Sequence, residues 1–388
     1  MQKFQKAVTL NKSALINALL FTKDGSLLLT GRGDEGTVKV WDLSSSACLE
    51  TISYPTPHWE QITGLIWAIA NNGDHSRFLC IGTGRGKIGF AKNRSVTPFL
   101  LGRISVTHAF DHPVEAMATD HINFRFAAAS QSGIIKVFQI SGPSSSDVLY
   151  EILAFGFPRG LHFSGDEHKE LVCYCLSQNR VAAWRVYGPH IKRLWVRSLN
   201  GPLGSVSVSD NGQSILIQDL KTSEFDIYSA QATMQLARFT TGSTESRIIQ
   251  GAFIHSQAVV LGSDHGEAYV YNTSTRNAAC LQKLTHDTGE EYPLVQLTAI
   301  CRSSGKVLMA TGANASSAKK SEICVWTQNT ISEPDLVDSA SGKIIHVHQH
   351  QYPKLALIFT VMVFGVFQLL VIMIMPSYLL RVWGDIKG

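Results

Sequence analysis

The chain is 388 residues long, carries a formal net charge of +4, and has 16% charged and 45% hydrophobic residues. So weak a charge, without any block of Lys and Arg, argues against nucleic acid as a partner. The length allows one or two domains with large cores. The first residues lack the apolar stretch and cleavage site of a secretory signal.

The first predicted element is a strand at residues 3–10 (KFQKAVTL), followed by a unit of three strands at residues 16–43. Two tight turns separate those three strands, at Lys23-Asp24-Gly25 and at residues 33–36, where glycine supplies the positive φ that such turns require. Residues 37–41 then alternate between the two faces of a strand and end in Trp41-Asp42. Three strands and a more variable fourth make one blade of a propeller.

The same pattern recurs at residues 62–90, 114–140, 160–187, 206–228, 248–271 and 294–326. The third strand of each of the seven units ends near an aromatic residue: Trp41, Phe90, Phe138, Trp184, Tyr228, Tyr271 and Trp326. One such sheet cannot bury both of its faces alone, whereas seven sheets packed radially can. We expect residues 3–10 to pair as the outer strand of the seventh blade, which would close the ring and remove two sheet edges.

Residues 29–43, LTGRGDEGTVKVWDL, closely resemble a WD40 repeat, and Trp41-Asp42 is the signature dipeptide. The resemblance covers roughly residues 1–330 and implies an all-β fold, a seven-bladed WD40-type β-propeller. The later units keep only the turns, a small-residue strand and the aromatic. The His–Ser/Thr–Asp–Trp hydrogen-bond set of the family is therefore expected to be incomplete in most blades. ITGLIW followed by LCIGTGRGKIGF is similar to basidiomycete WD-repeat membrane proteins.

The resemblance also implies a binding face, made by the turns between second and third strands and by the starts of the inner strands. Its turn positions include Arg32, Glu35, Arg85, Arg180, Lys221 and His265. Its inner-strand positions are Asn17, Thr63, Glu115 and Arg159. Their mixed charge predicts no single charged ligand. Arg85, Arg159 and Arg180 are the first candidates for mutation, because arginine is enriched in interface hot spots.

Other motifs point to structure rather than chemistry. The stretch from Gly82 to Gly89 is rich in glycine, but Ile81 and Ile88 stand where a P-loop needs Gly and Ser/Thr, so we interpret it as a turn. The seven cysteines are scattered and predict free, packed thiols in a reduced compartment, without a metal site. No nucleophile lies beside a base in a recognisable motif, so the sequence predicts neither an enzyme nor a cofactor.

An uninterrupted apolar run begins at Leu355 and ends at Met375, and Gln368 is its only strongly polar residue. As a helix it would be roughly 31 Å long, about the thickness of the hydrocarbon core of a bilayer. We predict a single C-terminal transmembrane helix at 355–375 that contacts the lipid bilayer, with a juxtamembrane linker at 331–354 and a short tail at 376–388. The late position of this segment predicts a tail-anchored protein with a cytosolic propeller, in the endoplasmic reticulum rather than the mitochondrial outer membrane.

These features predict a membrane-tethered scaffold that binds a cytosolic protein or peptide. The alternative is nucleotide exchange on a small GTPase of vesicle budding, because a family of membrane-anchored propellers has that activity. Those exchange factors carry a glycine-rich, potassium-binding loop near the N-terminus, and the matching region here, NALLFTKDGSLL, has none. A luminal or extracellular propeller is the third possibility.

Overall fold

The computed structural model describes residues 3–12, 15–33, 35–53, 59–71, 76–96, 99–142, 145–176, 178–274, 279–286, 294–303, 305–314 and 321–329. The chain divides into two units, residues 1–331 and 332–388, and every described residue belongs to the first. The predicted transmembrane segment and tail, and the linker before them, lie outside the described residues and stay predictions. Among the described residues, no helix has the length and apolarity needed to cross a membrane.

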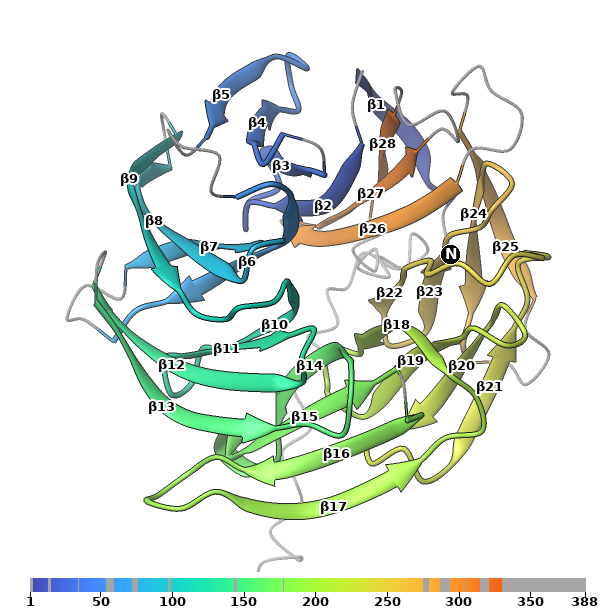
Figure 1. The fold of residues 1–388 in the computed structure, drawn as a ribbon. Coiled ribbons are helices and arrows are strands. Elements are labelled where there is room, and N and C mark those ends of the chain that lie inside the picture. Colours follow the sequence, from blue (N-terminus) through green and yellow to red (C-terminus); the bar gives the residue numbers. More distant parts are fainter. Residues whose placement is uncertain are drawn as a thin grey trace, which may run out of the picture. The chain divides into compact units, whose positions relative to one another are not determined.

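The described strands form seven four-stranded antiparallel sheets, arranged as blades around a ring (Figure 1). Blades 1 to 3 contain, from the inner strand outwards, β2 (Ile16–Phe21), β3 (Leu27–Arg32), β4 (Val38–Asp42) and β5 (Cys48–Ile52); β6 (Ile62–Ile69), β7 (Arg77–Thr83), β8 (Lys87–Val96) and β9 (Phe99–His108); and β10 (Val114–Asp120), β11 (Arg125–Ser130), β12 (Ile134–Gly142) and β13 (Ser145–Leu153). Blades 4 to 6 contain β14 (Pro158–Ser164), β15 (Glu170–Cys175), β16 (Arg180–Arg185) and β17 (Lys192–Ser198); β18 (Leu203–Val208), β19 (Ser214–Asp219), β20 (Glu224–Ser229) and β21 (Gln235–Phe239); and β22 (Gly251–His255), β23 (Ala258–Leu261), β24 (Glu267–Asn272) and β25 (Cys280–Thr285). Blade 7 contains β26 (Leu294–Ser303), β27 (Lys306–Asn314), β28 (Ser321–Asn329) and β1 (Gln5–Lys12), and a short 3-10 helix, η1 (Asp166–His168), joins β14 to β15. The seven blades predicted from the sequence are confirmed.

The two ends of the propeller meet in blade 7. Strand β1 pairs antiparallel with β28, with Leu10 opposite Ile323, so the start of the chain supplies the outer strand of the last blade. The backbone N–H of Phe4 donates to Gln282 Oε1 and Gln282 Nε2 donates to the Phe4 carbonyl, both at 2.8 Å, which ties the same segment to blade 6. The predicted closure is confirmed, although the strand begins and ends two residues later than 3–10.

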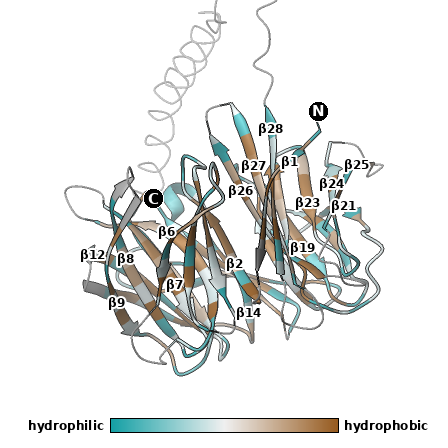
Figure 2. Ribbon diagram, turned by 90° about the horizontal axis from the view of Figure 1, so that it is seen from above, coloured by the Kyte–Doolittle hydropathy of each residue, from teal (hydrophilic) through white to brown (hydrophobic). Residues whose placement is uncertain are grey.

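The burial pattern of a strand follows from its place in the blade. Second strands lie between two neighbouring blades, so β3 and β11 are buried along almost their whole length and consist of apolar or small residues except for Arg32 at the end of β3 and Arg125 at the start of β11. The inner strand β10 instead alternates buried and half-buried positions, because one of its faces lines the central channel. In Figure 2, which is coloured by hydropathy, apolar residues are seen on second strands such as β7 and β23.

The aromatic residues predicted to mark the third strands lie in those strands: Trp41 in β4, Phe90 in β8, Phe138 in β12, Trp184 in β16, Tyr228 in β20, Tyr271 in β24 and Trp326 in β28. All seven are buried between blades. Six of the seven pack against the preceding blade, which for Trp41 is blade 7, whereas Phe90 packs against Phe126 and Phe138 of the following blade. The repeat read from the sequence is therefore the repeat of the packing in every blade except the second.

Candidate functional site

The inner strands share an irregularity at the end where they begin. In five blades the pairing with the second strand skips one residue near the start of the inner strand. The skipped residues are Asn17, Thr63, Glu115, Arg159 and Gln296. Such a β-bulge leaves one residue out of the ladder and redirects its side chain. In this chain the bulge therefore recurs at the positions that line the channel opening.

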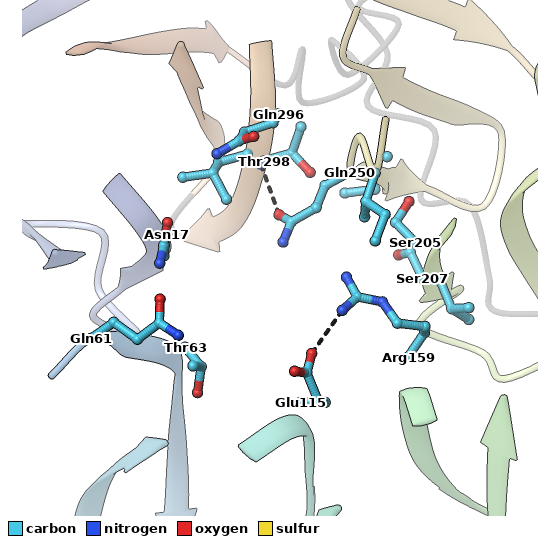
Figure 3. Close-up of a pocket in the computed structure, with 15 residues that line it drawn as sticks. Asn17, Gln61, Thr63, Glu115, Arg159, Ser205, Ser207, Gln250, Gln296 and Thr298 are labelled. Atoms are coloured by element: carbon cyan, nitrogen blue, oxygen red, sulfur yellow. Dashed lines mark hydrogen bonds and ion pairs between the residues drawn. The ribbon is translucent and has the colours of Figure 1, made fainter. Parts of the chain in front are cut away.

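The redirected side chains meet in one hollow of about 520 Å³ at the end of the channel (Figure 3). We call this hollow the polar mouth, and its polar lining comes from all seven blades: Asn17, Gln61, Thr63, Glu115, Arg159, Ser205, Ser207, Gln250, Gln296 and Thr298. Carboxamides and hydroxyls predominate, with one cation and one carboxylate among them. The structure thus brings together all four of the inner-strand residues predicted from the sequence.

The turns between second and third strands lie on the same side of the ring as the polar mouth. In six blades a backbone N–H at or just after the end of the second strand donates to a carbonyl near the start of the inner strand. These bonds are 2.8–3.2 Å long and join Gly33 to Leu15, Gly84 to Gln61, Gln131 to Pro113, Leu176 to Phe157, Leu220 to Pro202 and Gly262 to Gln250. The two sets of predicted residues therefore share one face, with the turns outside the mouth.

The charged pair of the polar mouth joins two neighbouring blades. Arg159 Nη1 lies 2.8 Å from Glu115 Oε2, and Arg159 Nε donates to the Gly204 carbonyl at 3.4 Å. Burial lowers the pKa of Arg159, and the charge of Glu115 opposes that effect. Burial likewise raises the pKa of Glu115, and the charge and hydrogen bond of Arg159 oppose it. Each group thus holds its partner in the charged form at a site that disfavours both charges.

Several polar groups of the mouth have hydrogen-bonding capacity to spare. Among the described residues, the side chains of Asn17, Gln61 and Gln296 make no hydrogen bond, and the buried Thr63 hydroxyl has no partner. The Gln250 carboxamide is held in place, because its Oε1 accepts from the Thr298 backbone N–H at 3.2 Å (Figure 3). An extended peptide needs such donors and acceptors, since its own backbone groups must be satisfied when it is bound.

The other candidates sit in the surrounding turns and are occupied by neighbours of their own. Arg32 lies 2.6 Å from Glu35 as an ion pair. Arg85 pairs with Glu60, and both side chains are about half exposed. The Arg180 guanidinium lies 5.3 Å from the centre of the Phe155 ring. These residues do not line the polar mouth.

Lys221 and His265 also lie outside the mouth. Lys221 is exposed, and its backbone N–H donates to Asp219 Oδ1 at 2.8 Å. His265 is held between Asp264 Oδ1 at 3.0 Å and the Tyr269 hydroxyl at 2.7 Å. The structure therefore places the six turn candidates on the rim and leaves only the inner-strand set together.

Sequence reasoning missed six of the ten polar residues of the polar mouth, mainly in blades 5 to 7. The missed residues are Gln61, Ser205, Ser207, Gln250, Gln296 and Thr298. Gln296 occupies the same bulge position as Asn17, so an alignment of the seven units on their inner strands would have found it. Gln61 and Gln250 precede their strands by one residue and carry no comparable signal.

The glycine-rich stretch near the second blade is a turn between strands β7 and β8, as interpreted from the sequence. Gly86 has φ +70°, and its carbonyl accepts from the backbone N–H groups of Ala109 and Phe110. A Cβ at this position would lie 2.0 Å from the Phe110 carbonyl oxygen. Glycine is therefore required here by the backbone and by the close approach of the neighbouring loop.

One buried cluster between blades 6 and 7 has metal-ligating atoms within 4.8 Å of one another: those of His286, which follows β25, and of Glu322 and Cys324 in β28. His286 Nε2 is 2.7 Å from Thr311 Oγ1, which also accepts from Trp326 Nε1 at 2.8 Å, and His286 Nδ1 is 2.9 Å from Glu322 Oε2. Burial raises the pKa of the Cys324 thiol to about 12, against the thiolate that a metal needs. We assign the cluster to a polar network like the hydrogen-bond set of the WD40 family, with Glu in the place of Asp.

The family model described as WD domain, G-beta repeat matches residues 4–42. The match begins just before β1 and ends with β4, so it takes the outer strand of blade 7 together with three strands of blade 1. The ring is a WD40-type β-propeller. No curated protein matches the chain. The similarity of residues 62–90 to basidiomycete membrane proteins stays a prediction.

Proposed function

We propose that this WD40-type propeller is a membrane-tethered interaction scaffold whose polar mouth binds a segment of a cytosolic protein. One observation carries the proposal: hydrogen-bonding side chains from seven blades converge on a single hollow of about 520 Å³. Propellers of this type generally bind protein partners, and such sites are concave with a few convergent polar groups.

The chemistry of the polar mouth favours a partner segment that is polar and has little net charge. Arg159 and Glu115 neutralise each other, so the mouth offers no net charge to an ionic ligand. Asn17, Gln61 and Gln296 each offer a carboxamide that both donates and accepts. A peptide backbone or an amide side chain matches this set, because it also presents paired donors and acceptors.

Tethering gives the binding its place in the cell. The apolar run at 355–375 would hold the propeller at one membrane surface, in our proposal the cytosolic face of the endoplasmic reticulum. A tethered scaffold raises the effective concentration of its partner for any second protein on that membrane. Alkaline carbonate extraction of the full chain tests this part: we expect it to stay with the vesicles, and its release would overturn the tethering.

The partner itself would be sought by proximity labelling from the full chain in cells, followed by binding measurements with purified candidates. We expect Asn17→Ala to weaken binding by about tenfold, as is typical of a residue near the centre of an interface. This residue makes no hydrogen bond among the described residues, so its loss should leave the melting temperature unchanged. Arg159→Ala should weaken binding further, because Arg159 links two blades at the centre of the mouth.

Arg197→Ala is the matched control, since Arg197 lies on the outer strand β17 with its guanidinium over the ring of Trp195. It should leave binding unchanged. Equal affinity of the Asn17, Arg159 and Arg197 variants for the partner would refute the polar mouth as the binding site. Accelerated nucleotide release from a panel of small GTPases would instead support exchange activity and replace the scaffold proposal.

A further inference from the structure

The inner strands end in a second hollow whose chemistry differs from that of the polar mouth. It measures about 680 Å³ and is lined by residues of β2, β6 and β26, by the turn after β2, and by Arg77 and His121. Thr298 lines both hollows, so they lie at the two ends of one channel. Most of the lining is apolar and includes Leu19, Trp67, Ile69 and Ile300. We call this hollow the apolar mouth.

Positive side chains from three blades surround the apolar mouth. Lys23 lies in the turn after β2, Arg77 begins β7, and Arg302 lies near the end of β26. No carboxylate belongs to its lining in the part of the chain that the structure describes. A smaller hollow of about 410 Å³ shares Lys23 and Arg77 and includes Asp24, whose carboxylate already accepts from Thr22 and Ser26.

Two of these cations have no ion-pair partner among the residues that the structure describes. Arg302 pairs with Asp210, but Lys23 and Arg77 form no ion pair with any described residue. Their effect reaches His121, which also lines the mouth. Burial lowers the pKa of His121, and Arg77, His168 and Lys23 lower it further against the opposing charge of Asp120. The apolar mouth therefore lies in a region of positive potential.

We propose that the apolar mouth binds an acidic peptide segment in which one apolar side chain is flanked by carboxylates. The apolar side chain would enter the hollow between Leu19, Trp67 and Ile300, and the flanking carboxylates would pair with Lys23 and Arg77. Cations on separate blades suit charges spread along a chain better than a single compact headgroup. Burial of the apolar anchor supplies affinity, and the rim charges select the partner and speed its arrival.

This site is distinct from the polar mouth, so the propeller would hold one partner at each end of its channel. The probe is a random heptapeptide library displayed on phage, applied to the full chain in phosphatidylcholine nanodiscs. We expect the selected peptides to carry Asp or Glu next to Leu, Ile, Phe or Met. A synthetic copy should bind at least about tenfold more weakly to Lys23→Glu/Arg77→Glu, because two attractions become repulsions.

The matched control is Lys192→Glu/Arg197→Glu, which changes the net charge equally at two exposed cations of the outer strand β17, outside the mouth, and should bind like the wild type. Selection on Lys23→Glu/Arg77→Glu itself should enrich Lys and Arg in place of the acids. Both double variants replace side chains that are not buried, and thermal melts check their folding; Lys23→Gln/Arg77→Gln should show a smaller loss in the same direction.

Three results would overturn the proposal. The first is a selection without acidic bias, and the second is an affinity that the Lys23→Glu/Arg77→Glu exchange leaves unchanged. The third is displacement of the peptide by phosphatidylserine vesicles, together with loss of vesicle binding in the Lys23→Glu/Arg77→Glu variant. That result would assign the mouth to an anionic membrane surface. Arg159→Ala should leave peptide binding intact, so failure of the apolar mouth and failure of the polar mouth are separable.

Discussion

A buried ion pair in blade 3, which is hydrogen-bonded to blade 4, makes a sharp test of how this ring is held together. Asp120 is fully buried at the end of β10, and its Oδ2 accepts from Arg125 Nη2 at 2.7 Å and from Nε at 2.9 Å. Arg125 Nη2 also donates to the His168 carbonyl at 2.6 Å, and its Nη1 donates to the Val186 carbonyl. His168 Nδ1 lies 2.9 Å from Asp120 Oδ1. One carboxylate thus orients a guanidinium that binds the next blade.

We predict that Asp120→Ala lowers the free energy of unfolding by about 3–5 kcal/mol, because it leaves the Arg125 charge buried without its partner. Unfolding entropy of about 2.1 cal/mol/K per residue, over the roughly 330 residues of the propeller, gives about 0.7 kcal/mol/K. The melting temperature should therefore fall by about 4–7 °C. Urea unfolding followed by tryptophan fluorescence measures the free energy, and calorimetry measures the temperature.

Asp166→Ala is the matched control, because Asp166 lies on the same side of the ring in η1 but is exposed. It should change stability by less than about 0.5 kcal/mol. Arg125→Met combined with Asp120→Ala should cost at least about 1 kcal/mol less than the sum of the single changes, because both buried charges are then gone. Additive costs, or an Asp120→Ala variant as stable as the control, would refute this reasoning.

The same pair predicts a pH dependence. Burial alone would raise the pKa of Asp120, but hydrogen bonds from Asn123 and Arg125 outweigh it and hold the pKa below its usual value. A carboxyl with a lowered pKa in the folded state stabilises the fold at pH values above its unfolded pKa. The stability difference between wild type and Asp120→Ala should therefore be complete at neutral pH and shrink as the pH falls below about 4.

Three further changes test other parts of the ring. Thr311→Val should lower the free energy of unfolding by about 2–6 kcal/mol, because Thr311 is hydrogen-bonded to both the Trp326 N–H and a nitrogen of His286. Thr30→Val should lower it by only about 1–3 kcal/mol, because Thr30 accepts from the Trp41 N–H alone. Urea midpoints compare the two variants, and equal costs would contradict the network of Thr311, His286 and Trp326. Gly86→Ala should destabilise the fold by several kcal/mol more than Gly212→Ala. Both glycines have positive φ, but only at Gly86 would a Cβ meet backbone, the Phe110 carbonyl oxygen at 2.0 Å. Equal melting temperatures of the two variants would contradict this steric argument. Leu10→Ala should lower the free energy of unfolding by about 2–5 kcal/mol and speed amide hydrogen exchange in β28, because Leu10 packs in the closing blade. Amide exchange in β28 that stays slow would show that closure of the ring does not depend on Leu10.

Much of the fold could be predicted because its signals are local. A turn such as that at Gly25 needs positive φ, and an aromatic such as Trp41 needs a sheet to cover, so each unit carries its own evidence. Repetition adds to it, since the same pattern recurs seven times. The closing strand was predictable for a related reason: β1 precedes the first unit, and β28 otherwise ends the last blade with an open edge.

The candidate site was predictable only in part, because its members are brought together by the ring and not by the chain. The sequence indicated that Asn17, Thr63, Glu115 and Arg159 begin inner strands. It gave no sign that the ladder skips these residues, since a β-bulge depends on the register between two strands. Gln296 was missed as well, although aligning the seven units on their inner strands places it at the position of Asn17.

The sequence by itself determined the number of blades, the inner, second and third strands and the residues that point between blades, because hydrophobic periodicity and turn chemistry act over a few residues. Only the tertiary structure decided which side chains share the channel. Arg159 meets Glu115 across 44 residues, and Leu19 shares the apolar mouth with Ile300 from the other end of the propeller. Such neighbours are set by closure of the whole ring, where one blade's position depends on the packing of all the others.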